Sequence, residues 1–233
     1  MIVPAALLRS DRGEGLLGRD AWLKVMNLAR KNKIEVFEAA RKERDPRDLK
    51  DGRQGGAELW VKERDPLSLE ELFEGVKENP EDRGLWLALD QIQDPHNLGA
   101  IFRTAAFFGV RGIITTFERA APLSATVYDV ACGGVDAVPF AIETNLARSL
   151  ERAKDMGVWT LGASEHADQS VDQIPHDRAW LLLVGNEERG LRRLTLENCD
   201  MICQIPPFGH VVTSLNVSVA AAILISKLSS AST

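Results

Sequence analysis

The sequence predicts an α/β protein: a mostly parallel sheet with helices on both faces, plus a small N-terminal αβ region. Two observations support this fold class. Solid apolar runs such as Leu85–Leu89 and Ala179–Val184 are typical of strands that are buried on both faces. These runs alternate with helical segments that end at glycine, such as Gly109 and Gly157, as expected for crossovers between parallel strands.

The N-terminal part is predicted to contain helices and short strands. Residues 19–32 form a helix with an apolar face, and the charged, glycine-containing segment 39–56 forms a loop. The other elements are strands at Ile34–Phe37 and Ala57–Lys62 and a helix that starts at Ser68, where Glu71 completes a capping box. Asn79–Asp82 ends that helix, so we expect domains of residues 1–80 and 81–233.

The second domain shows the regular alternation. Its expected strands are Leu85–Leu89, Gly112–Thr115, Val158–Leu161, Ala179–Val184 and Met201–Ile205. Its expected helices are Gly99–Phe108, Ser124–Ala131, Leu146–Met156 and Asn216–Leu228. Sites in parallel sheets lie beyond the carboxyl ends of the strands. The loops after Leu89, Val184 and Ile205 are therefore the places to search.

Composition restricts the class of protein. The chain of 233 residues is 45% hydrophobic, which excludes extensive disorder, and its apolar runs are too short to span a membrane. The N-terminal residues lack the basic start of a signal peptide. Residues 1–64 hold 15 Lys and Arg against 11 Asp and Glu, whereas the remainder holds 13 against 23. This basic arm on an acidic body suggests that a polyanion meets the N-terminal part first, although a solvated mixed surface would look similar.

Cysteine and histidine usage argues against a metal centre. The three cysteines, Cys132, Cys199 and Cys203, form no CxxC pair and are expected to be small buried thiols in a reducing cytoplasm. The four histidines show no HxH or HxxxH spacing, so no metal site is expected.

The three loops carry polar clusters whose simplest explanations are local. Asn97 could cap the helix that carries Arg103, and Arg103 could form a surface ion pair. Gly185 and Gly190 bracket a tight turn whose backbone amides could hold a ligand. Ser214 or Asn216 could cap the last helix.

Two common motifs are excluded. The Gly185–Gly190 spacing is that of a P-loop, but Leu191-Arg192 stands where Lys-Ser/Thr is required. The nucleophile elbow GxSxG of serine hydrolases does not occur.

Taken together, the loops are more specific. N-x-G-x-x-x-R from Asn97, G-x-E-x-x-G-L from Gly185, and I-P followed by S-L-N-V-S-V-A from Ile205 occur in that order. This set resembles the SpoU (TrmH) branch of the SPOUT RNA ribose 2′-O-methyltransferases over about residues 85–230, and is most similar to the type that methylates a guanosine of large-subunit ribosomal RNA.

The resemblance implies a C-terminal deep trefoil knot, S-adenosylmethionine as the cofactor, an RNA substrate, no metal and a homodimer that uses the final helix and the Arg103 helix. It implies catalytic roles for Asn97, Arg103, Glu187, Ser214 and Asn216. It implies cofactor binding by Gly185, Asn186, Gly190, Ile205 and Leu215. A side chain at Gly185 should then clash with the ligand and leave the fold intact. Because a guanidinium stays protonated, Arg103 is better suited to clamp a phosphate than to act as a base.

The sequence departs from the family pattern in two places. Residues 22–62 are similar to the second half of a ribosomal-protein-like RNA-binding domain whose first half is shortened. The segment Pro206–Ser214 is one residue longer than the common pattern, with the extra residue expected around His210–Thr213. Three alternatives stay open: a transfer-RNA substrate, a non-catalytic RNA-binding protein, and a dinucleotide-binding protein, although the last would require a G-x-G-x-x-G motif.

Overall fold

The protein is described from a computed structural model. The structure describes residues 4–9, 19–38, 57–61, 64–79, 81–209, 211 and 214–229. The expected loop 39–56 and the expected extra residue near His210, Val212 and Thr213 lie wholly or mostly outside these ranges. The chain divides into two compact units, Met1–Asp65 and Pro66–Thr233, and each is described by itself.

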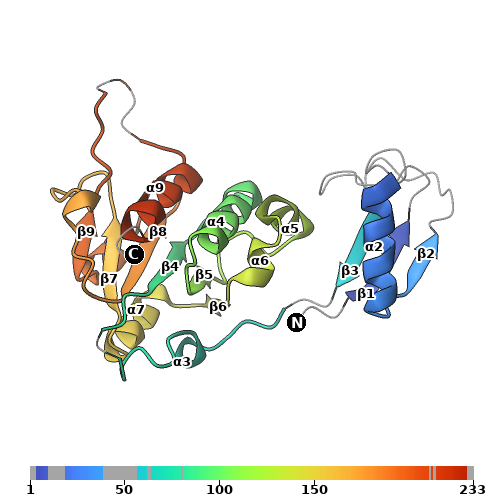
Figure 1. The fold of residues 1–233 in the computed structure, drawn as a ribbon. Helices are drawn as coiled ribbons and strands as arrows, with labels where there is room; N and C mark the ends of the chain where they lie inside the picture. The colour runs from blue at the N-terminus through green and yellow to red at the C-terminus, as the bar shows by residue number, and fades with distance from the viewer. Residues whose placement is uncertain are drawn as a thin grey trace. The chain divides into compact units, whose positions relative to one another are not determined.

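In the residues that the structure describes, the smaller unit shows a three-stranded mixed sheet and one helix (Figure 1). Its elements are β1 (Pro4–Arg9), α2 (Arg19–Lys31), β2 (Val36–Glu38) and β3 (Ala57–Val61). The central strand β1 pairs parallel to β2 and antiparallel to β3. The helix and the two later strands confirm the prediction, whereas β1 was not expected. On α2, Ala29 is buried and Val25 and Met26 are half-buried, as the predicted apolar face requires.

The larger unit is built on a six-stranded sheet of order β6-β5-β4-β8-β7-β9, in which every pair is parallel. The strands are β4 (Leu85–Asp90), β5 (Gly112–Thr116), β6 (Phe140–Glu143), β7 (Trp159–Ala163), β8 (Trp180–Gly185) and β9 (Met201–Cys203). All five predicted strands are present. The additional edge strand β6 was missed because it is short and follows Pro139 directly.

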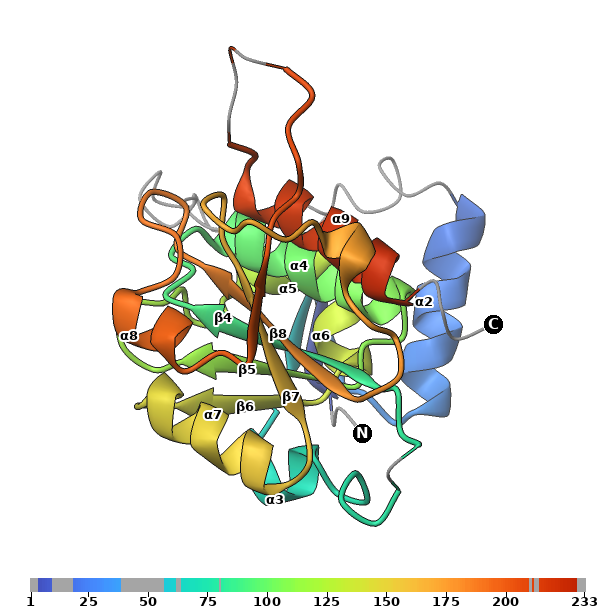
Figure 2. The same ribbon diagram turned by 90° about the vertical axis from the view of Figure 1, so that its left-hand side faces the viewer.

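Helices cover both faces of this sheet, and Figure 2 shows the two layers. On one face lie α4 (Pro95–Phe107), α5 (Ala125–Ala131), α6 (Gly134–Ala137) and α9 (Val217–Ser229). On the other lie α3 (Leu69–Leu72), α7 (Leu146–Asp155) and α8 (Arg193–Glu197). Each face buries its own apolar cluster, so the sheet is closed to water on both sides.

The expected boundary at residue 80 differs from the division in the structure. The backbone N–H of Leu67 donates to the carbonyl of Phe140 at 2.8 Å, and α3 buries Leu69 and Leu72. The predicted capping box between Ser68 and Glu71 is present. Residues 66–79 therefore belong with the larger unit, while the RNA-binding role of the N-terminal region stays a prediction.

The C-terminal chain is bonded to the β7–β8 connection. The N–H of Val171 donates to the carbonyl of Gln204 at 2.9 Å, and the N–H of Gln204 donates to Gln169 at 2.8 Å. On α9, Lys227 forms an ion pair with Asp172 of the short helix η2 (Val171–Gln173), with an Nζ–Oδ1 distance of 2.6 Å. From the edge strand β9 the chain thus returns to the middle of the sheet, where α9 packs against α4, β4 and β8.

The cysteines are only partly as predicted. Cys203 is buried and Cys199 is half-buried, and burial raises the pKa of each thiol to about 12, so both are inert near neutral pH. Cys132 is exposed, contrary to the expectation of a buried thiol, because it ends α5 in a left-handed conformation at the surface.

None of the helices in the described ranges is long and apolar enough to cross a membrane. Among the same residues, no group of three His, Cys, Asp or Glu side chains is arranged to hold a metal ion.

Candidate functional site

A cavity of about 470 Å³ opens at the carboxyl edge of the sheet, where the loops after β7, β8 and β9 meet the start of α9. Its volume lies in the range of small-molecule sites. Its wall consists of residues 163–166, 184–191, 196, 203–205, 214–215, 217, 220 and 224.

The five residues expected to bind the cofactor all line this cavity. Gly185, Asn186 and Gly190 come from the loop after β8, whereas Ile205 and Leu215 come from the two ends of the loop between β9 and α9. Two of the expected catalytic residues, Glu187 and Ser214, lie on the same wall.

The turn at residues 185–190 is closed by its own hydrogen bonds. Asn186 and Gly190 exchange two backbone hydrogen bonds, of 3.1 and 2.9 Å. The side-chain Oδ1 of Asn186 accepts from the N–H groups of Glu188, at 3.0 Å, and Arg189, at 3.3 Å. The predicted tight turn is confirmed, and these four N–H groups bond inside it. Ligand binding by the other backbone groups of the turn stays a prediction.

Gly185 is required by the turn itself. A Cβ atom there would stand 2.1 Å from the carbonyl carbon of Gly190 and 2.2 Å from the nitrogen of Leu191. Gly190 adopts a φ of +64°, which glycine adopts readily. The expectation that a side chain at Gly185 leaves the fold intact is wrong, because it would meet backbone before it could meet a ligand.

Asn97 joins the three loops. The side-chain amide of Asn97 donates to Glu187 Oε1, and its Oδ1 accepts from the amide of Asn216; both distances are 3.1 Å. Asn97 is only 8% exposed. It does not cap α4, because that helix begins at Pro95 and its N-cap is Asp94, whose Oδ1 accepts from the His96 N–H at 2.8 Å. The capping explanation is therefore replaced by a bridge across the site.

The last helix is capped by one of the two residues predicted for this role. Asn216 Oδ1 accepts from the backbone N–H of Ser218 at 2.9 Å and from its hydroxyl at 2.7 Å. Asn216 therefore caps α9 and also contacts Asn97, while Ser214 remains exposed on the cavity wall.

Arg103 lies apart from this cavity. Its side chain is exposed on α4 and lines a second hollow of about 550 Å³, together with Phe107, Cys132 and Ala222 of α9. Among the ion pairs found within the described ranges none involves Arg103, so the surface-pair explanation finds no partner there.

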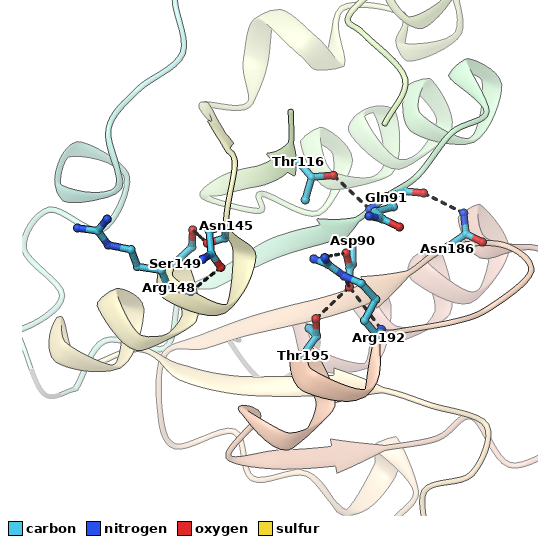
Figure 3. A network of polar contacts seen from close by, with 9 residues as sticks. All are labelled: Asp90, Gln91, Thr116, Asn145, Arg148, Ser149, Asn186, Arg192 and Thr195. Carbon is cyan, nitrogen blue, oxygen red and sulfur yellow. Dashed lines mark hydrogen bonds and ion pairs between the residues drawn. The ribbon is translucent and has the colours of Figure 1, made fainter. Parts of the chain in front are cut away.

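A buried acid that the sequence analysis did not single out ties the first loop to the second (Figure 3). Asp90 is 1% exposed at the end of β4. Its Oδ1 lies 2.9 Å from Arg192 Nη2, and its Oδ2 accepts from Arg192 Nε and Thr195 Oγ1, both at 3.0 Å. An acid that ends a buried strand was a usable signal, but its partners follow about a hundred residues later.

The next residue, Gln91, has a strained backbone. Its φ is +62°, and two hydrogen bonds hold it: its N–H donates to Thr116 Oγ1 at 3.3 Å, and its carbonyl accepts from the Asn186 amide at 3.0 Å (Figure 3). The sequence analysis also missed the loop after β7, residues 163–166. The rule that sites follow parallel strands could have found it.

These features define a class: an α/β protein with a ligand-sized cavity formed at its C-terminal chain. Solved structures share this architecture. AviRb, a SpoU methyltransferase from Streptomyces viridochromogenes, superposes with a TM-score of 0.77 over 98% of this chain and 82% of its own, at 22% identity. The same protein has been solved with the cofactor AdoMet. An rRNA methyltransferase from Sinorhizobium meliloti gives a TM-score of 0.74 over 97% and 80% of the two chains, at 23% identity. The predicted fold, the knotted α/β fold of this group, is confirmed.

The family follows from the sequence comparison. The model of the SpoU rRNA Methylase family matches residues 84–226, and the chain belongs to this family. The 23S rRNA (guanosine-2′-O-)-methyltransferase RlmB of Nitrosomonas europaea is 45% identical over 170 residues, 73% of this chain. The protein of that name from Pseudomonas aeruginosa is 41% identical over 180 residues, 76% of this chain and 72% of its own. The match spans 64% of the length of the Nitrosomonas relative, slightly less than two thirds.

Proposed function

We propose that the protein methylates a ribose 2′-hydroxyl of RNA with S-adenosylmethionine as donor, and that its target is a guanosine of 23S ribosomal RNA. The convergence of the loops after β8 and β9 on one cavity carries this proposal, because every residue expected to hold the cofactor lies on its wall. The names of the two relatives, 45% and 41% identical, support the substrate.

The cavity fits the cofactor in size and chemistry. It offers apolar side chains from Ile205 and Leu215 and polar groups from Ser164 and Glu187. Bound there, S-adenosylmethionine supplies an electrophilic methyl group on a sulfonium. The remaining task of the chain is to orient the acceptor hydroxyl, which can contribute several kcal/mol to lowering the barrier. Asn97 fixes Glu187 and Asn216, so the polar side chains beside the cavity are preorganised.

A second copy of the chain is proposed to complete the site. Arg103 lies in a different hollow from the cofactor wall, so within one chain it has no part in the cavity. In the same hollow α4 exposes Phe107, which is 83% accessible, and elsewhere on α9 Val219 is 47% accessible. Exposed apolar side chains on these helices favour a homodimer in which Arg103 serves the partner's site. There Arg103 clamps RNA phosphate through its planar fork.

The N-terminal unit is proposed to bind RNA. Residues 1–64 carry a net charge of +4, whereas the remainder carries −10. Polyanion binding is driven by cationic side chains, so the basic part is the better candidate for the first contact.

The test is to map 2′-O-methyl groups in ribosomal and transfer RNA from a strain that lacks the gene, and to restore them with the purified protein. One lost guanosine methyl group in 23S ribosomal RNA is expected. Loss of a transfer-RNA methyl group would assign the alternative substrate. An unchanged map, with no methyl transfer in vitro, would leave an RNA-binding protein of the same fold.

A further inference from the structure

We infer that Asp90, through Arg192 and Thr195, is a positioning residue that sets the cofactor turn at residues 185–190. The inference deepens the proposed function and rests on it for the identity of the ligand. Its physical basis is the set of contacts that attach the second loop to the first.

The turn is anchored at both ends. Before it, Gly185 pairs with Asp90 in the parallel ladder between β4 and β8. After it, the backbone N–H of Arg192 and two of its side-chain nitrogens face the Asp90 carboxylate, at 2.9 to 3.5 Å. One residue of the first loop therefore fixes the chain on either side of the turn.

The burial of the carboxylate gives this anchor its strength. Asp90 is 1% exposed, whereas the Arg192 side chain is 50% exposed. A buried carboxylate is stable only when it is paired and hydrogen-bonded, so Arg192 and Thr195 are held against it. The position of α8 relative to β4 is then set by Asp90, and the turn between β8 and α8 has little freedom.

The centre of the turn is held from the same loop. Gln91, next to Asp90, accepts a hydrogen bond from Asn186, and Asn97 donates one to Glu187. The loop after β4 thus holds the turn at its ends and at its centre. Loosening Asp90 should therefore loosen the part of the cavity wall that the turn forms.

The chain offers a matched control at the opposite edge of the sheet. Asp82, 8% exposed, forms an ion pair with Arg111, whose side chain is 50% exposed, and accepts from the N–H of Gly84 at 2.7 Å. This pair has similar burial, but it precedes β4 and β5 and lines neither of the two cavities described.

The experiment compares Asp90→Asn with Asp82→Asn in the full chain. We expect both to lower the melting temperature. The affinity for S-adenosylhomocysteine, measured by calorimetry, should fall about tenfold in Asp90→Asn, the effect of losing hydrogen bonds to a charged group, and stay within about twofold in Asp82→Asn. The KM for S-adenosylmethionine should rise, with kcat at saturating cofactor falling by less than about threefold.

A second variant guards against a failure of Asp90→Asn to fold. Thr195→Val keeps the shape of the side chain and removes one hydrogen bond to Asp90, so it should weaken cofactor binding by about threefold to tenfold. Arg192→Lys keeps the charge but loses the two-point contact, and its affinity should lie between those of wild type and Arg192→Gln.

Amide hydrogen exchange separates this inference from the proposed function, because it needs no ligand. The amides of Asn186 and Gly190, which close the turn, should exchange about tenfold faster in Thr195→Val or Asp90→Asn and unchanged in Asp82→Asn. Unchanged exchange and unchanged affinity in both turn variants would overturn the inference even if the wild type binds cofactor. Faster exchange in the two turn variants, combined with a wild-type protein that binds no cofactor, would instead sink the proposed function and leave the positioning role standing.

Discussion

The two edges of the parallel sheet carry nearly the same ion pair in different surroundings. At the carboxyl edge, Asp90 and Arg192 join the loop after β4 to the loop after β8, and the loop after β8 forms part of the wall of a cavity. At the amino edge, Asp82 and Arg111 join the starts of β4 and β5, and the Arg111 guanidinium lies 5.3 Å from the ring centroid of Trp86. A buried acid with a half-exposed arginine is therefore no sign of a site by itself. What the pair holds in place decides its role.

Removing Arg103 should produce the largest loss. If Arg103 clamps RNA in the transition state, Arg103→Ala should lower methyl transfer about a thousandfold, roughly 4 kcal/mol, while the affinity for S-adenosylhomocysteine stays unchanged. Arg103→Lys should recover little, because an ammonium lacks the planar fork. Single-turnover assays with saturating RNA measure the effect.

The matched control for Arg103 is Arg83→Ala at the amino edge, a side chain that is 51% exposed. It should leave turnover within about twofold, since surface charges contribute little. Near-normal turnover in Arg103→Ala would remove both the clamp and the need for a second copy at the site.

Glycine substitutions at the two edges should differ in their stability cost, because the two glycines differ in their backbone contacts. Gly185→Ala places a Cβ 2.1 Å from the Gly190 carbonyl carbon and should destabilise the fold by about 3 kcal/mol. Gly109, before β5, has a φ of +70° but open space around it, so Gly109→Ala should cost only about 1 kcal/mol of left-handed strain. Urea unfolding compares the two. Equal losses would mean that the turn relaxes more easily than its hydrogen bonds suggest.

Asn97→Ala should combine a moderate stability loss with a loss of turnover. It leaves Glu187 and the Asn216 amide without their shared partner, which should reduce the free energy of unfolding by about 1 to 2 kcal/mol. Turnover should fall in parallel because the polar wall is no longer fixed. Asn198→Ala, which loses one hydrogen bond to Leu194 at the amino edge, is the control and should retain turnover. A double-mutant cycle with Glu187→Gln that shows no coupling would contradict the bridge.

Individual strands and helices show how much of the fold could be predicted from the sequence. Solid apolar runs identified β4 and β8 because strands buried on both faces need no alternation. The four-residue elements β6 and α6 were missed because so few residues carry no periodicity. The start of α4 was placed four residues late, although Asp94 followed by Pro95 is a strong helix start.

The site was accessible to sequence analysis only in part. Its loops could be located, because strand ends in a parallel sheet share one edge. The pairing of Asp90 with Arg192, and of Asn97 with Asn216, spans about a hundred residues and depends on the path of the C-terminal chain along the β7–β8 connection. No local propensity encodes such a path, and knotted chains are rare. The knot was expected only from the resemblance to a family.

The smallest effect is expected from an acid at the amino edge that serves stability alone. Asp200, before β9, accepts from the backbone N–H and the hydroxyl of Thr160, both at 2.8 Å, and lies 2.8 Å from Lys154 Nζ. Partial burial raises the pKa of Asp200, but the hydrogen bonds from Lys154 and Thr160 outweigh it and hold the pKa below its usual value. A lowered folded-state pKa stabilises the fold above the unfolded value of about 4, and this contribution is lost as the pH falls through the folded value.

Asp200→Asn should therefore cost about 1 kcal/mol at pH 7, with the difference from wild type shrinking below about pH 4. Urea unfolding across this range measures it, with the exposed Glu197→Gln, expected within about 0.5 kcal/mol, as the control. A difference that persists unchanged to pH 2 would mean that Asp200 acts by packing and not by its charge.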